Sequence, residues 1–294
     1  MFARVLFPTD FSPQADQFVG CLHEMKPLGV EDIVLLNVVE LGPQIGFASD
    51  TFEQMLAWKK DAEPRLAHRK NRIEMNGIRC RWRLELGKPS LEIVHVAEEE
   101  GAALIAMWTH GHGFVRGVLL GSVTHDVVRH ASVPVLVLKI TVMDKLGRTD
   151  CGLVCQHMFR RVLLPTDFSE GEGEALALVK NLRVTGLPDV VVLHVRDTRK
   201  EDEVGPQDVI CDRMERIRRE LEFFGFTVNS LLVDGNPAKT IDRIAREQDV
   251  SLIVIGSHGR SAAEDVLLGS VSDAVICQHT RPVLVVRHGM PKVC

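Results

Sequence analysis

The 294-residue chain lacks any apolar run near the ~18–20 residues that a membrane-spanning helix needs. The apolar stretch at its start, Met-Phe-Ala-Arg-Val-Leu-Phe, is too short for a signal peptide. Basic charge is not in excess either, because 35 Lys and Arg stand against 40 Asp and Glu, a formal net charge of −5. General nucleic-acid binding rests on a basic face. We therefore expect neither a membrane protein nor a nucleic-acid-binding protein.

Cysteine is scarce, odd in number and scattered, with seven residues along the chain. This does not predict the disulfide framework of a secreted protein, so we expect a cytoplasmic location. Apolar residues are plentiful: 45% of the chain is hydrophobic and 26% is charged, which is typical of a folded globular protein and excludes a disordered one. At ~100–200 residues per domain, the length predicts two domains.

Several chemical signatures are also absent. No Gly-x4-Gly-Lys-[Ser/Thr] phosphate loop occurs, so fast hydrolysis of that kind is not supported. The pair Gly171 and Gly173 is too short for a dinucleotide fingerprint, and the spacing of Cys151, Cys155 and His157 is not that of a standard zinc site.

What the chain does contain is an internal repeat. Three segments recur in the same order: Arg4–Ser12 as Arg161–Ser169, Val118–Val123 as Val266–Val271, and Pro134–Val137 as Pro282–Val285. Ordered matches at both ends predict a tandem duplication of one domain of ordinary size. We expect the first domain at residues 1–140, a linker at 141–158 and the second domain at 159–288.

Each half alternates strand and helix patterns. The β-branched run Val190–Val195 is typical of a strand buried on both faces, and Ile210, Met214 and Ile217 lie on one helical face. Strands separated by such helices predict crossover units and a parallel sheet. The predicted fold class is α/β, with two repeated doubly wound domains, each an open five-stranded parallel sheet with helices on both faces. In the second half we expect strands at 161–165, 190–195, 227–233, 251–255 and 282–286, and helices at 171–183, 210–224, 237–248 and 270–278.

Polar and glycine-rich turns follow two of these strands, at the sheet edge where such folds bind ligands. Pro165-Thr166-Asp167 follows the first strand, and the loop after the fourth contains Gly256 and Gly259 and leads to Gly269 and Ser270. Glycines permit positive φ and close backbone approach, and a helix start attracts anions. Asp167 suits a ribose hydroxyl or a metal-bound water better than a phosphate. The pattern predicts a phosphate site, although ordinary turn chemistry also uses these residues.

The spacing Gly256-x2-Gly259-x9-Gly269-Ser270 resembles the nucleotide-binding signature of the universal stress protein family, in its ATP-binding branch. Pro-Thr-Asp-Phe-Ser, Leu193-His194-Val195, Gly235-Asn236-Pro237 and the last strand are also similar to that family, and the resemblance covers both halves. It implies a site for ATP or AMP, with Mg²⁺ as an optional ion. The turn after the first strand would hold adenine and ribose, and the glycine-rich segments would hold phosphates. The implied nucleotide-binding residues of the second domain are Pro165, Thr166, Asp167, Val195, Gly235, Gly256, Ser257, His258, Gly259, Arg260, Ser261, Gly269, Ser270, Val271 and Ser272.

The first domain departs from this pattern at Trp108, which stands where the second domain has Gly256. A tryptophan does not readily adopt positive φ, and its indole would fill volume near the phosphates. Three alternatives stay open there: an empty site, a site restricted to a shorter nucleotide such as AMP, and a site that tolerates Trp108 because its backbone is ordinary. We expect a weakened nucleotide site and not a lost one. The matching residues of the first domain are Pro8, Thr9, Asp10, Val38, Gly87, Gly111, Gly121, Ser122 and Val123.

The resemblance implies a nucleotide-dependent binding module in stress response or signalling. Two alternatives remain open: a slow ATPase or self-phosphorylating enzyme using Asp167, Mg²⁺ and Ser270 or Ser272, and a nucleotide-free scaffold that dimerises. The family commonly pairs domains through the last strand, and an exposed apolar sheet edge favours aggregation. We therefore expect Val133–Leu138 and Arg281–Val286 to pair antiparallel within the chain, which leaves other faces free for a homodimer.

Overall fold

The computed structural model describes most of both halves of the chain. The described residues are 2–19, 22–40, 48–109, 121–139, 158–169, 171–186, 188–197, 199, 206–257, 268–278 and 281–287.

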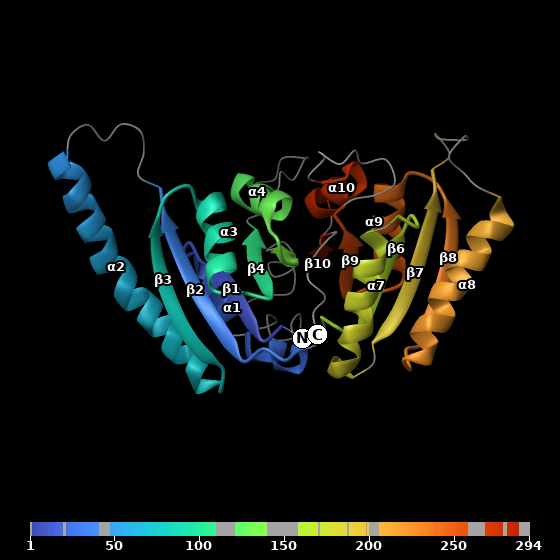
Figure 1. The fold of residues 1–294 in the computed structure, drawn as a ribbon, viewed down its shortest axis with the longest axis horizontal. Coiled ribbons are helices and arrows are strands. Elements are labelled where there is room, and N and C mark those ends of the chain that lie inside the picture. Colours follow the sequence, from blue (N-terminus) through green and yellow to red (C-terminus); the bar gives the residue numbers. More distant parts are fainter. Residues whose placement is uncertain are drawn as a thin grey trace.

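Both halves consist of five strands joined by helices (Figure 1). The first half contains β1 Arg4–Pro8, α1 Pro13–Val19, the 3₁₀ helix η1 Leu22–Leu28, β2 Asp32–Val39, α2 Ala48–Met75, β3 Arg79–Leu86, α3 Pro89–Glu99, β4 Leu104–Thr109, α4 Ser122–His130 and β5 Val135–Lys139. The second half contains β6 Arg161–Thr166, α7 Gly171–Asn181, the 3₁₀ helix η2 Leu182–Thr185, β7 Asp189–Arg196, α8 Gln207–Phe223, β8 Val228–Asp234, α9 Pro237–Glu247, β9 Leu252–Gly256, α10 Ser270–Gln278 and β10 Val283–Val286. The strands and helices expected in the second half are present, with ends that either agree or differ by at most three residues.

The strands form one ten-stranded sheet in the order β3-β2-β1-β4-β5-β10-β9-β6-β7-β8. Neighbours within each half are parallel, so the predicted α/β class and the two repeated five-stranded units are confirmed. The halves join where β10 runs antiparallel to β5, with Leu284 opposite Leu136 and Val283 opposite Val137. The structure thus has the antiparallel pairing of last strands that the sequence predicted, and it fixes the register.

Two apolar layers cover the two faces of this sheet. Helices α1, α2, α7 and α8 pack on one face, where Phe18, Leu66 and Leu221 are buried. Helices α3, α4, α9 and α10 pack on the other face, where Val127 and Val275 are buried. None of the helices in the described part of the chain is long and apolar enough to cross a membrane.

Helix α9 shows how local sequence builds these layers. The Asn236 side chain accepts a hydrogen bond from the Lys239 N–H at 3.1 Å, and Pro237 occupies the first helical position, where its missing N–H costs nothing. Ile241 and Ile244 then lie on the buried face at helical spacing. The cap fixes where the helix begins and therefore how the preceding turn meets the sheet.

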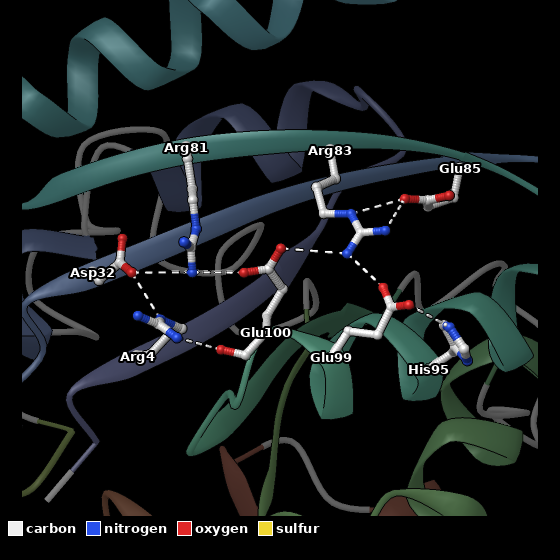
Figure 2. A network of polar contacts seen from close by, with 8 residues as sticks. All are labelled: Arg4, Asp32, Arg81, Arg83, Glu85, His95, Glu99 and Glu100. Carbon is white, nitrogen blue, oxygen red and sulfur yellow. Dashed lines mark hydrogen bonds and ion pairs between the residues drawn. The ribbon is translucent and has the colours of Figure 1, made fainter.

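A charged network joins the end of α3 to the first three strands (Figure 2). Arg81 bridges Asp32 at 3.3 Å and Glu100 at 2.6 Å, while Arg83 reaches Glu99 at 2.6 Å. The bonds from Arg83 and His95 lower the pKa of Glu99. These contacts hold α3 against the sheet at the amino ends of β1 and β2, away from the carboxyl ends where ligands bind in such folds.

Candidate functional site

A cavity of about 460 Å³ lies at the carboxyl ends of β6, β7 and β9, within the range of small-molecule sites. Its wall contains these residues that the sequence singled out: Pro165, Thr166, Asp167, Val195, Gly256, Gly269, Ser270, Val271 and Ser272. A second cavity of about 880 Å³ occupies the equivalent place in the first half. The residues of its wall that the sequence singled out are Pro8, Thr9, Asp10, Val38, Gly121, Ser122 and Val123.

The turn after β6 is built from two side-chain hydrogen bonds to the backbone. The Phe168 N–H donates to Thr166 Oγ1 at 3.0 Å, and the Ser169 N–H donates to Asp167 Oδ1 at 3.1 Å. These bonds hold Phe168 at φ 60°, a conformation that bulky residues rarely adopt. The first half repeats this turn, with Phe11 at φ 61°. The turn fixes the aspartate at the strand end, beside the cavity.

The neighbouring strand β7 supports this turn through a hydrogen bond and a ring contact. His194 Nδ1 lies 2.8 Å from the Thr166 carbonyl oxygen and must carry the proton, because a carbonyl only accepts. The Phe168 ring stacks on His194 at 4.6 Å between centroids. In the first half Asn37 replaces this histidine, and its Nδ2 donates a hydrogen bond to the Thr9 carbonyl oxygen at 2.7 Å.

The start of α10 is tied directly to the end of β9. The Gly269 N–H donates to the Ser257 carbonyl at 2.7 Å, and the Ser272 hydroxyl donates to the Gly256 carbonyl, also at 2.7 Å. Helix geometry leaves the N–H groups of Ser270 and Val271 without acceptors inside α10. These two groups, together with the helix dipole, make the cavity wall suited to an anion.

Comparison with known proteins identifies the family. A sequence model described as the universal stress protein family matches residues 1–139 and 158–287. The chain belongs to the universal stress protein family. Universal stress protein MJ0577 of Methanocaldococcus jannaschii is 34% identical over 158 residues, which cover 44% of this chain and 96% of that protein. A universal stress protein of Mycobacterium tuberculosis is 26% identical over 218 residues, 69% of this chain and 68% of that one.

The fold of this universal stress protein also matches a solved structure along its length. The crystal structure of a universal stress protein from Archaeoglobus fulgidus has a TM-score of 0.75 and 26% sequence identity. The match covers 97% of this chain and 96% of the Archaeoglobus chain. The two family domains of this chain therefore match, over almost their full length, the chain of a solved relative.

Gly256 does not have the conformation that the sequence predicted. It is the last residue of β9, paired in register with Val286, and it is not among the described glycines with positive φ. Trp108 lies in the equivalent strand β4, opposite Leu138, and its indole packs on Phe18 at 5.6 Å between centroids. The φ argument against a site in the first half is therefore wrong. The larger cavity also persists with Trp108 in its wall.

Four other predicted residues support the fold around the cavities. Gly235, at φ 149°, and Gly87, at φ 155°, turn the chain between a strand and the next helix and do not line the cavities. Ser257 is buried and holds the start of α10. The Ser272 hydroxyl proton is used within the fold, while Ser272 itself stays in the cavity wall as a predicted nucleotide-binding residue. The predicted residues His258, Gly259, Arg260, Ser261 and Gly111 lie outside the described residues.

Glu172 is a cavity residue that sequence reasoning missed. It is the second residue of α7, lines the 460 Å³ cavity and accepts a hydrogen bond from the Thr166 hydroxyl. Burial raises the pKa of Glu172, although the bonds from Thr166 and the Phe168 N–H pull in the other direction. Ala15 occupies the corresponding position of the first half. In the sequence, this glutamate-to-alanine difference between the repeats was the one signal that could have pointed to Glu172.

Side chains from the opposite half were missed as well. His125 and Arg129 of α4 line the cavity of the second half, and Asp273 and Cys277 of α10 line the cavity of the first. A single half gives no sign of them, because they reach the cavity across the β5–β10 seam. Among the described residues, no three His, Cys, Asp or Glu side chains come together in a way that would hold a metal ion.

Proposed function

We propose that this universal stress protein binds an adenine nucleotide, ATP or AMP, in the 460 Å³ cavity of its second domain. It would act as a nucleotide-dependent binding module in stress response or signalling. The two domains would span residues 1–140 and 159–288, joined by a linker at 141–158. The observation that carries the proposal is one cavity wall that combines a fixed carboxylate, an apolar surface and the start of a helix.

Each part of this wall suits one part of the nucleotide. Leu193, Val195 and Ile255 give an apolar surface for a base. One carboxylate oxygen of Asp167 is used by the turn, and this fixes the group so that it can accept a hydrogen bond from a ribose hydroxyl. The N–H groups at the start of α10, which have no acceptor within the helix, would donate hydrogen bonds to phosphate oxygens. Mg²⁺, where present, would screen the phosphates from the nearby carboxylates.

Calorimetric titration of the full chain with adenosine, AMP and ATP, with and without Mg²⁺, tests the proposal. The Asp167→Asn substitution retains the oxygen that accepts the Ser169 N–H and removes the charge. We expect it to weaken adenosine and ATP alike by roughly ten-fold or more, since hydrogen bonds to charged groups contribute about 1.5–3 kcal/mol.

The matched control is Asp10→Asn, because Asp10 makes the same turn in the first domain. It should leave the tighter site unchanged. Mass spectrometry of the freshly purified, denatured chain would identify a nucleotide that co-purifies. Failure of adenosine, AMP and ATP to bind the native chain at millimolar concentration would refute the proposal.

A further inference from the structure

Helices α4 and α10 meet across the seam between the halves and lie side by side (Figure 1). His125 Nε2 lies 3.0 Å from Asp273 Oδ1, and both residues are the fourth of their helix. The paired residues Leu136 and Leu284 are also equivalent positions of the two repeats. Equivalent residues therefore face each other across a pseudo-twofold axis. As a consequence, the end of each helix lies near the start of the other.

Arg129 lies at the end of α4, one turn beyond His125. It lines the second domain's cavity together with Gly269 and Ser270 at the start of α10. Its Nε is buried and has no hydrogen-bond partner within the described part of the chain. A buried N–H without an acceptor is costly, so this position suits an acceptor that the described residues do not provide. A guanidinium beside the N-terminus of a helix binds phosphate oxygens strongly, because both groups donate hydrogen bonds and carry positive charge.

The first domain's cavity differs at this point. Cys277 occupies the position equivalent to Arg129 and lines that cavity beside Gly121 and Ser122. The titratable residues of its described wall are His125 and the carboxylates Asp10, Asp126 and Asp273, with no arginine or lysine. Asp273 and His125 line both cavities, Glu172 lines only the second domain's cavity and Asp126 only the first domain's. Arg129 is the one arginine or lysine in the described walls, and it lines the second domain's cavity alone.

We propose that Arg129 of the first domain binds the phosphates of a nucleotide held by the second domain, and so makes that site select the triphosphate over the nucleoside. The inference rests on the proposed nucleotide function and names the side chain that sets its specificity. The first domain's cavity has no such cation in its described wall and would accept at most a less charged ligand. The asymmetry between the sites then comes from the opposite domain, and the β5–β10 seam must be intact for tight ATP binding.

The test compares ATP with adenosine on the full chain. Arg129→Gln should weaken ATP binding by roughly ten-fold or more, because it removes hydrogen bonds between charged groups, and should change adenosine binding less than two-fold. Arg129→Lys keeps the charge but loses the planar fork, so we expect an intermediate loss. The control is Arg243→Gln, which removes an exposed arginine that pairs with Glu247 on α9 and does not line the cavity.

A gain of function gives the converse test. Cys277→Arg places an arginine beside the start of α4, in a cavity with room for it. We expect a second ATP site of measurable affinity, and this second site should persist when Arg129→Gln is added. Should Cys277→Arg fail to fold, as circular dichroism would show, the Arg129 variants still decide the question.

The outcomes distinguish the role of Arg129 from the proposed nucleotide-binding function on which it rests. If the native chain binds ATP and Arg129→Gln leaves the ratio of ATP to adenosine affinity unchanged, the role of Arg129 is overturned and the nucleotide function stands. If no adenine nucleotide binds the native chain, both are overturned.

Discussion

A disulfide across the β5–β10 seam is the sharpest test of how the two domains meet. Val137 and Val283 are opposite each other in the register and are almost fully buried. Opposed residues of an antiparallel pair have Cα atoms roughly 4.5–5.5 Å apart, within the range that a disulfide spans. The double substitution Val137→Cys and Val283→Cys should therefore form a bond within one chain under mild oxidation.

The expected stabilisation follows from the length of chain that the bond closes. Residues 137 and 283 enclose a loop of about 145 residues, for which the chain-entropy estimate is ~5 kcal/mol as an upper bound. Comparing oxidised with reduced protein in denaturant cancels the cost of replacing two valines. Peptide mapping is needed to locate the bond, because the chain has seven cysteines of its own.

The matched control moves one cysteine by two residues. Val135 is opposite Val285 and only diagonal to Val283, so the pair Val135→Cys and Val283→Cys has Cα atoms roughly 7–8 Å apart, too far for an unstrained bond. It should oxidise more slowly and stabilise less. Bonds found only between chains, or faster closure of the diagonal pair, would refute the intramolecular register and the placement of α4 beside α10 that depends on it.

Four further substitutions test the residues that support the site. Gly235→Ala should cost roughly 1–3 kcal/mol in a denaturant melt, because φ is 149° and a Cβ would meet Thr240 Oγ1 at 2.9 Å. Gly173→Ala should instead be neutral or stabilising, since a Cβ there meets nothing within 4 Å. Ser272→Ala should cost about 1–3 kcal/mol by the same measurement, because it leaves the carbonyl at the end of β9 without its donor. Burial raises the pKa of Glu172, so the folded state binds this proton more tightly than the unfolded chain does. The free energy of unfolding should therefore fall as the pH rises from the ordinary carboxyl pKa toward the raised value. Glu172→Gln should flatten this fall in melting temperature as the pH rises above the ordinary carboxyl pKa of about 4, and an unchanged pH profile would contradict the assignment.

The sequence by itself determined the duplication, the strand and helix order and the turn after the first strand of each half. These features depend on residues that are neighbours along the chain. Alternating apolar runs select strand or helix, Asn236 and Pro237 start α9, and Thr166 and Asp167 bond to the backbone two residues on. The apolar last strands also predicted their own pairing, because two exposed edges of this kind are satisfied by each other.

The tertiary structure decided which side chains share a cavity. The extended backbone of Gly256, the engaged hydroxyl of Ser272 and the buried carboxyl of Glu172 depend on how β9, α10 and α7 pack, which no local pattern encodes. The position of Arg129 depends on still more, because it lies far along the chain from Gly269 and reaches it only when the two domains pack about their pseudo-twofold axis. Repeats in the sequence predict two sites, whereas only the contact between the repeats brings the arginine of the first half into the cavity of the second.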